Sequence, residues 1–410
     1  MKRGLLIKNA SQVLTMKPEK TDCVGLIENG YIYAEDGVIK AVGSMDQFKN
    51  DVFALGPADE IDAAGKIVLP GFVDCHTHSV FGGSRVAEYS IKLTDNDPAA
   101  LEKLGIEAGM YGTVNATKNL PAELLEEQSF KRVSGMLSNG TTTIEIKSGY
   151  GLSTDSEIKM LEIIKRLNER LPLDIHSTFL GAHGWPKDMS KEKYIDVLTK
   201  DMIPKVSELK LAQFCDVWCD DGYYTAKESE KILSCGRDYG LIPKIHTDCY
   251  SYIGGSDLAA DMHMISADHL NYTPENVFKK LRGANVVGVV APGTDFAVKH
   301  PKPFDPRPML EAGMDLAIAT NCNPGVWVES MQVILVLACR QHGFTPAEAV
   351  KTATKGGALA LGLNDVGILD AGKKADIQIW DLDTYEDIIY KFGAKYIKTV
   401  IKDGNIVVNN

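Results

Sequence analysis

Short apolar runs alternate with polar turn segments over roughly the first sixty residues of the chain. This pattern predicts strands at residues 4–7, 23–27, 31–34 and 38–42. Asn29-Gly30 and Asp36-Gly37 are expected to form hairpin turns, because these dipeptides tolerate the positive φ angles of two-residue loops. A further apolar run that begins at Val68 is too short for a helix and is bounded by turn residues, so it predicts a buried strand.

A different alternation fills the middle of the chain, where strand candidates are separated by helical segments such as residues 155–170 and 226–239. The strand candidates are residues 141–146, 173–180, 215–219, 241–245, 264–267, 286–290 and 316–319. Together with the strand at Val68 they number eight. Alternating strands and helices are typical of a parallel α/β sheet, and eight repeats suit a closed (β/α)8 TIM-like barrel. A doubly wound open sheet is the alternative, although no Gly-x-Gly-x-x-Gly motif follows the first strand.

The β pattern returns after Gly367, with an apolar run at residues 375–380 and a hairpin pattern at residues 399–408. We therefore expect one small β-rich domain, built from both chain ends, beside one barrel domain. Their predicted bounds are residues 1–66 with 367–410 for the small domain, and residues 67–366 for the barrel.

Composition and charge narrow the range of partners. Hydrophobic residues make up 44% of the 410 residues, which is ample for a core of this size. A formal net charge of −11 argues against a nucleic-acid or anionic-membrane partner, because both need clustered Lys and Arg. There is no long apolar run and no signal-like start, and the eight cysteines are scattered. We therefore expect a cytoplasmic protein with reduced thiols.

The candidate chemistry lies at the ends of predicted strands, where barrels of this kind carry their active sites. Residues i and i+2 of a strand share one face, so His76 and His78 can direct their rings at one point, as a divalent metal requires. His183, His246 and His269 each follow another predicted strand. No Gly-x-Ser-x-Gly motif supplies a serine nucleophile, and no Gly-x-x-x-x-Gly-Lys-Ser/Thr loop supplies a phosphate site.

An ordered set of motifs gives these residues a family resemblance. The segments that carry it are residues 74–78, 81–85, 145–152, 177–183, 266–270, 305–309 and 330–332. In these segments the chain resembles the imidazolonepropionase family, which is part of the amidohydrolase superfamily. Members of this family are metal-dependent hydrolases of histidine degradation. Members open the ring of 4-imidazolone-5-propanoate to give N-formimino-L-glutamate. The resemblance spans nearly the whole chain and implies a barrel with a split small domain.

The resemblance also implies a set of metal ligands. His76, His78 and His246 would bind one divalent metal, Zn or Fe, which lowers the pKa of a water molecule that attacks the ring carbonyl. His269 would orient or deprotonate this water, or protonate the leaving ring nitrogen. Asp74 or Asp248 could hold the outer nitrogen of a ligand histidine. Lys147 could in principle be carboxylated to bridge two metals, but its surroundings resemble the mononuclear type.

Substrate contacts follow from the same resemblance. Arg85 is expected to bind the propanoate group, since a guanidinium group pairs with a carboxylate through two hydrogen bonds. Tyr150 and His183 would hydrogen-bond the imidazolone ring. Asn323 and Gly325, in the Thr-Asn-Cys-Asn-Pro-Gly run, are further substrate-binding candidates. Because related barrels often pair, we expect a homodimer.

Two positions depart from the usual family pattern. Asn321 stands where the family usually has an aspartate that binds the metal and accepts a proton. An asparagine oxygen can still touch a metal, but it cannot take up a proton at ordinary pH. Cys249 stands where a glutamate or glutamine is usual. It would act as a soft ligand or base if the metal depressed its pKa, or else it is a space-filling thiol.

Three functions remain open at this point. The first is ring opening of 4-imidazolone-5-propanoate. The second is a different reaction, that of another metal-dependent cyclic amidohydrolase or deaminase, and the third is a non-catalytic paralogue that keeps the pocket for binding. The presence of Arg85, Tyr150 and His183 together favours the first, because residues that contact the substrate would be expected to change with the substrate.

Overall fold

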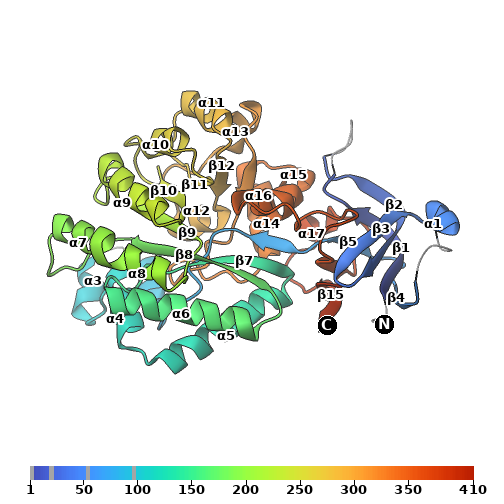
Figure 1. Cartoon of the computed structure of the whole chain (residues 1–410), viewed down its shortest axis with the longest axis horizontal. Helices are drawn as coiled ribbons and strands as arrows, with labels where there is room; N and C mark the ends of the chain where they lie inside the picture. The colour runs from blue at the N-terminus through green and yellow to red at the C-terminus, as the bar shows by residue number, and fades with distance from the viewer. Residues whose placement is uncertain (1–3, 18–22, 52–55, 95–97) are drawn as a thin grey trace.

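The computed structural model describes residues 4–17, 23–51, 56–94 and 98–410. Two sheets of eight strands organise them, and the two lie next to each other along the long axis of the molecule (Figure 1). Within the described ranges, no helix is both long and apolar enough to cross a membrane.

The smaller part is a mixed sheet in which strands from the two chain ends pair directly. Its order is β16-β15-β14-β5-β1-β2-β3, with β4 paired to β1. Its strands are β1 (Gly4–Leu14), β2 (Leu26–Glu35), β3 (Val38–Ser44), β4 (Ala58–Asp62), β5 (Ile67–Pro70), β14 (Ile377–Trp380), β15 (Ile397–Lys402) and β16 (Asn405–Asn409). Because β5 pairs with both β1 and β14, the two ends of the chain form one sheet, as predicted.

One of the two predicted hairpin turns is present. Asp36-Gly37 joins β2 to β3, and both residues have positive φ angles, 53° and 78°. Asn29-Gly30 instead lies inside β2, so the turn predicted there is wrong. Asn29 does have a positive φ of 46°, but β1 runs alongside β2 past this point, with a shift of register. The local distortion is therefore accommodated inside a continuous strand.

The run that begins at Val68 forms two strands rather than one. β5 belongs to the small sheet, whereas β6 (Phe72–Asp74) pairs with β7 of the barrel. The chain changes sheets at Gly71, where a Cβ atom would lie only 2.0 Å from the Oγ1 of Thr142. The chain therefore passes from the small sheet to the barrel at Gly71.

The larger part is a nearly closed barrel of eight parallel strands, in the order β6 to β13. After β6 come β7 (Thr141–Lys147), β8 (Asp174–Ala182), β9 (Phe214–Cys219), β10 (Ile242–Thr247), β11 (Ser266–His269), β12 (Val287–Val290) and β13 (Leu316–Ile318). The segments that follow the first and last strands meet, because the amide of His78 donates to the carbonyl of Cys322 at 2.9 Å. The barrel prediction is confirmed, and the doubly wound alternative is wrong.

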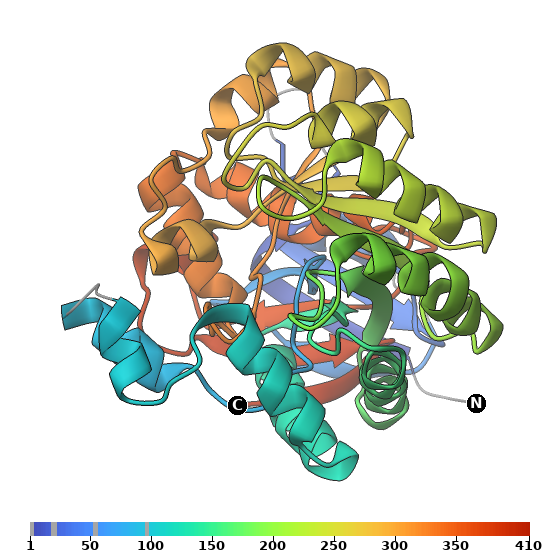
Figure 2. The ribbon, with the colours of Figure 1, turned by 90° about the vertical axis from the view of Figure 1, so that its left-hand side faces the viewer.

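Helices surround the barrel strands, as Figure 2 shows from the end opposite the small sheet. Two of them, α6 (Thr154–Arg170) and α9 (Ala226–Asp238), match the helices expected there. The others along the barrel are α2 (Val86–Thr94), α3 (Pro98–Lys103), α4 (Gly109–Asn119), α5 (Ala122–Ser138), α7 (Lys191–Val197), α8 (Ile203–Glu208), α10 (Gly255–Asp261), α11 (Glu275–Gly283), α12 (Pro292–Val298), α13 (Pro306–Glu311), α14 (Met331–His342), α15 (Pro346–Lys351) and α16 (Gly357–Ala360). Of the remaining helices, α1 (Met45–Asp51) packs against β2 and β3 of the small sheet, and α17 (Asp387–Tyr390) packs against α14.

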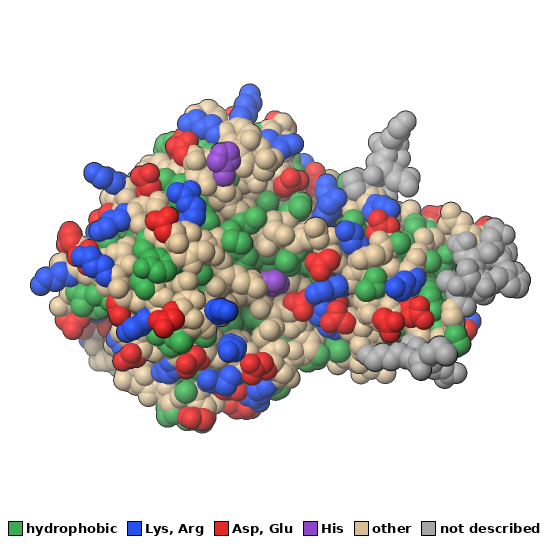
Figure 3. Space-filling view, in the orientation of Figure 1, with side chains coloured by type: hydrophobic (Ala, Val, Ile, Leu, Met, Phe, Trp, Pro, Cys, Tyr) green, Lys and Arg blue, Asp and Glu red, His purple; other side chains and the backbone are tan. Residues whose placement is uncertain are grey.

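The small sheet contacts the start of a barrel strand through ion pairs. Lys374 and Lys402 both lie within 3.0 Å of the carboxylate of Asp174, the first residue of β8. The carboxyl ends of the barrel strands therefore lie away from this contact. On the face drawn in Figure 3, basic and acidic side chains are interspersed over both parts of the molecule.

Candidate metal centre

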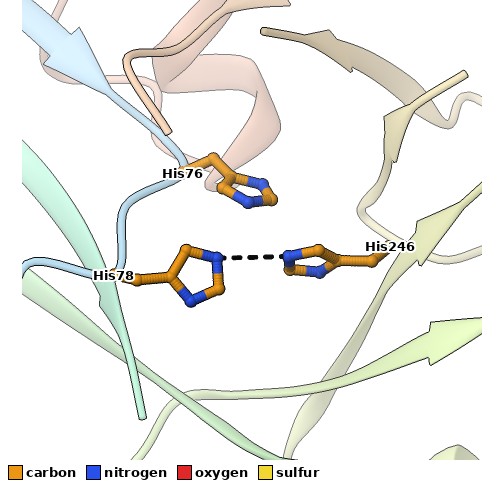
Figure 4. A group of neighbouring side chains, drawn as sticks. All are labelled: His76, His78 and His246. Atoms are coloured by element: carbon orange, nitrogen blue, oxygen red, sulfur yellow. Dashed lines mark hydrogen bonds between the residues drawn. The ribbon is translucent and has the colours of Figure 1, made fainter. Parts of the chain in front are cut away.

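Three histidine rings from two barrel segments point toward one another in Figure 4. His76 and His78 follow β6 directly, and His246 lies on β10. One ligand nitrogen of each lies within 4.8 Å of the others, and all three residues are buried. The Nε2 atoms of His78 and His246 are 3.3 Å apart. The structure thus brings together the three histidines that the sequence suggests as metal ligands.

This group of nitrogens fits a divalent metal ion. The Nε2 atom of His76 is buried and has no hydrogen-bond partner among the described residues, although buried polar atoms usually have one. Imidazole nitrogens directed at a common point are typical ligands of Zn²⁺ and of other divalent transition metals. A bound metal would satisfy this Nε2 atom. The Nδ1 atom of His78 is also buried without a hydrogen-bond partner among the described residues.

Buried carboxylates hold the outer nitrogens of two of these histidines. The Nδ1 of His76 lies 2.6 Å from the Oδ2 of Asp268 on β11. The Nδ1 of His246 lies 2.9 Å from the Oδ2 of Asp216 on β9. Such partners fix the ring orientation and leave Nε2 for the metal. Neither aspartate was among the candidates predicted from the sequence, although an aspartate inside an apolar strand is a signal that could have identified both.

The two aspartates suggested from the sequence have other partners. Asp74 accepts hydrogen bonds from the backbone amide and the hydroxyl of Thr320. Asp248 accepts hydrogen bonds from the hydroxyl groups of Ser256 and Thr273. Both therefore stabilise loops at the ends of their strands, and neither holds a ligand histidine in the manner of Asp268.

Burial favours the neutral form of four histidines of the site, His76, His78, His183 and His269. It is the main cause that lowers the pKa of His76, His78 and His269 well below the ordinary value. Burial also lowers the pKa of His183 to about 3. A neutral imidazole keeps a lone pair, which a metal ligand and a general base both require.

His269 lies at the end of β11, next to the metal histidines. Its ring centroid is 5.4 Å from that of His76 and 5.2 Å from that of His246. Its φ angle is 86°, which is rare outside glycine, and Leu270 follows with a φ of 61°. Unusual backbone of this kind is concentrated at functional sites, where the surrounding structure compensates for its strain. The neutral ring can accept a proton close to the metal position.

Tyr150 and His183 form an aromatic wall beside the metal histidines. The ring of His183 stacks on that of His78 with centroids 4.9 Å apart, and Tyr150 lies 5.3 Å from His183. Burial raises the pKa of Tyr150, so its hydroxyl group stays a hydrogen-bond donor. The loop that carries Tyr150 is held by Glu157, whose carboxylate accepts hydrogen bonds from three backbone amides, those of Gly149, Gly151 and Leu152.

Only part of the Arg85 guanidinium group is free to bind an anion, because Glu88 accepts hydrogen bonds from the rest. Its Nε and Nη2 atoms donate to Glu88 at 2.7 and 2.6 Å. Nη1 faces Gly325, where a Cβ atom would lie 3.1 Å away. Arg85 and Glu88 also line a cavity of about 280 Å³. A side chain at position 325 would therefore crowd Nη1, and glycine avoids this contact.

Asn321 is joined to the metal histidines through the backbone. Its amide donates to the carbonyl of His76 at 3.1 Å, and its side-chain Nδ2 donates to the hydroxyl of Thr294 at 2.9 Å. Asn323 donates to both the backbone and the side-chain oxygen of Asn321, and its own Oδ1 accepts from the amide of Gly325. Asn323 thus connects the metal side of the site to the Arg85 side.

Cys249 follows β10, and its thiol is buried. Burial, together with the nearby charges of Asp220 and Asp295, raises its pKa. The thiol is not a member of either group of possible metal ligands found among the described residues. These features favour the simpler of the two sequence hypotheses, in which Cys249 fills space as a protonated thiol.

Comparisons with known proteins show which family the chain is similar to. Residues 242–407 match the model of the Amidohydrolase family. The imidazolonepropionase of Geobacillus kaustophilus (strain HTA426) is 40% identical over 100% of this chain and 99% of its own length. The imidazolonepropionase of Alkaliphilus oremlandii (strain OhILAs) is 40% identical over 98% of this chain and 97% of its own.

Solved structures show the same fold at much lower sequence identity. An atrazine chlorohydrolase from Arthrobacter aurescens TC1 complexed with zinc is 16% identical, with a TM-score of 0.71, over 99% of this chain and 95% of that chain. An adenosine deaminase from Xanthomonas campestris with bound zinc is 17% identical, with a TM-score of 0.71, over 99% and 93%.

Proposed function

The chain belongs to the imidazolonepropionase family of amidohydrolases, and we propose that its three-histidine centre opens the ring of 4-imidazolone-5-propanoate to N-formimino-L-glutamate. This reaction is the hydrolysis of a carbon–nitrogen bond of a cyclic amide. The observation that carries this proposal is the convergence of His76, His78 and His246 on one point, with a buried Nε2 left unpaired. We propose Zn or Fe as the divalent metal, because imidazole ligands suit both.

Several side chains would bind and orient the substrate. The Nη1 atom of Arg85, which faces Gly325 rather than Glu88, would receive the propanoate carboxylate. Tyr150 and His183 would hydrogen-bond the ring next to His78. In this proposal Glu88 and Asn323 act as positioning residues, since one fixes Arg85 and the other fixes the loop that carries Gly325.

Proton transfer would fall to His269. When bound, the metal supplies a Lewis acid that makes water in the site more acidic. The neutral imidazole of His269 would take a proton from the attacking water and return it to the ring nitrogen that leaves. Asn321 has no carboxylate for this step and the Cys249 thiol stays protonated, so both are assigned polar or packing roles around the metal.

We also propose a cellular location and an oligomeric state for the protein. All eight cysteines are free thiols in the structure, which suits a cytoplasmic protein. The homodimer stays a prediction, and light scattering coupled to size-exclusion chromatography would test it.

The first experiment measures turnover and metal content on one sample. 4-Imidazolone-5-propanoate is generated in place from urocanate by urocanase, and we expect rapid loss of the compound with about one divalent metal ion per chain. A chelator should abolish this loss, and added metal should restore it. Metal without turnover would point to another ring substrate, and neither metal nor turnover would point to a binding protein.

Replacing Arg85 by methionine tests the carboxylate site. We expect KM to rise by about 10- to 100-fold with kcat little changed, because a charge-assisted hydrogen bond contributes ~1.5–3 kcal/mol. Lys92→Met is the matched control, since Lys92 also pairs with Glu88 but is half exposed. An unchanged KM in Arg85→Met would place the propanoate elsewhere.

A further inference from the structure

A second group of possible metal ligands lies beside the three histidines. The ligand atoms of Asp216, His246 and Asp268 lie within 4.8 Å of one another, and all three residues are buried. Two carboxylates and an imidazole would suit a second divalent cation. The Nζ atom of Lys147 is, however, already among them, 2.9 Å from Asp216 and 3.8 Å from Asp268.

Lys147 is held firmly in this position. It is fully buried, and its Nζ atom also lies 2.7 Å from the Oε1 of Glu145. Glu145 is fixed in turn by the backbone amide of Thr77 and by the hydroxyl of Thr178. Three buried carboxylates, those of Glu145, Asp216 and Asp268, thus lie within 3.8 Å of Nζ, and the charged ammonium form of lysine is the one that pairs with them.

The barrel topology explains why these charges meet. Lys147, Asp216 and Asp268 come from β7, β9 and β11, which alternate around the barrel. Alternate strands contribute side chains to the same interior layer of a barrel, and these layers are usually filled by branched apolar residues. A layer with a buried ammonium ion and two buried carboxylates costs solvation energy, so each charge must be paired for the layer to persist.

We propose that the ammonium group of Lys147 is a fixed cation that occupies the second metal position and positions Asp216 and Asp268. Through these carboxylates it orients His246 and His76, which makes it a positioning residue. A carbamate on Lys147 would bring negative charge against two carboxylates, so the lysine stays unmodified and the centre takes a single metal ion. This inference rests on the proposed function only in that the histidines bind a metal.

The test counts metal ions in Lys147→Met, which removes the charge but keeps the length of the side chain. With excess Co²⁺ or Zn²⁺ we expect binding to rise from about one to about two ions per chain, because the unpaired carboxylates attract a second cation. Atomic emission spectrometry gives the count, and the Co²⁺ absorption spectrum reports the new environment. If the Lys147→Met protein folds and binds a single ion with wild-type affinity, the proposal is overturned.

Lys244→Met is the matched control. Lys244 is equally buried, but it donates to the carbonyl of Cys75 and lies 3.9 Å from Glu145. Among the described residues it has no ion pair to Asp216 or Asp268, although its charge also acts on Asp268 from a longer distance. We expect this variant to bind about one ion per chain, as the wild type does. A second ion bound by Lys244→Met would show that any loss of buried charge is enough, and would overturn the specific role of Lys147.

The wild-type protein gives a test that does not depend on a variant that folds. Carbon-13 NMR in labelled bicarbonate should show no lysine carbamate, and metal titration should saturate at about one ion per chain. A carbamate signal or a second tightly bound ion would overturn the proposal. These measurements do not depend on turnover, so failure of the proposed substrate assignment is detected separately, by the imidazolonepropanoate assay.

Discussion

Replacing His269 by glutamine is expected to lower kcat by about 10²- to 10⁴-fold, while the protein keeps about one metal ion per chain. The loss of kcat is expected because the His269 ring lies close to the metal site without being a metal ligand. Its centroid is 5.2 Å from that of His246, and it is not a member of the group of metal ligands. Glutamine keeps a hydrogen-bonding side chain but cannot take up a proton. Steady-state rates with 4-imidazolone-5-propanoate and metal analysis of the same preparation measure the two quantities.

The control for this substitution is His263→Gln. His263 is an exposed histidine whose Nδ1 atom lies 3.4 Å from the carbonyl oxygen of Ala284, and its replacement should leave kcat unchanged. If His269→Gln retains full activity, another group moves the proton. If it loses its metal as well, His269 is a ligand and the proposed division of roles is wrong.

The alternation of elements was readable from the sequence because the barrel strands are buried on both faces. Buried parallel strands are short apolar runs between turn residues, and helices such as α6 have a clear polar face. The pairing partner of each strand was harder to predict from the sequence. Val68 and Phe72 belong to one apolar run, yet they lie in different sheets, because their strands pair with partners that are distant in sequence.

Residues at strand ends were the part of the site that sequence could predict. His76, His78 and His246 are brought together because carboxyl ends of parallel strands meet at one end of a barrel. The partners of these histidines were not predictable in the same way. Asp268 contacts His76 across 192 positions of sequence, and only the closure of the barrel places them together. Local motifs suggested Asp74 and Asp248 because they are near in sequence.

The interior charges show how the site depends on the fold beneath it. Lys147, Asp216 and Asp268 contact no substrate in the proposed mechanism, yet two of them touch the outer nitrogens of metal histidines. A buried ion pair contributes little net stability, whereas loss of one partner costs ~3–5 kcal/mol. Substitutions in this layer should therefore alter metal binding and folding together, and each variant needs a separate measure of folding.

Replacing His246 by alanine is expected to reduce metal content from about one ion per chain to near zero, and turnover to background. Loss of an outer partner alone typically costs ~10- to 100-fold in metal affinity, and loss of a ligand should cost more. The substitution also leaves Asp216 without its imidazole partner. Metal analysis after dialysis and the increase of Tm on addition of Zn²⁺ measure the effect, and that increase should disappear in the variant.

His183→Ala distinguishes loss of a ligand from general damage to the site. Its ring stacks on His78 at 4.9 Å but is not a member of the metal-ligand group. We expect this variant to keep its metal and its metal-dependent Tm increase, and to lose affinity for the substrate. Chelator-treated wild type provides the folded reference without metal for His246→Ala. Full metal content in His246→Ala would contradict the three-histidine centre, because two histidines and water would then suffice to hold the ion.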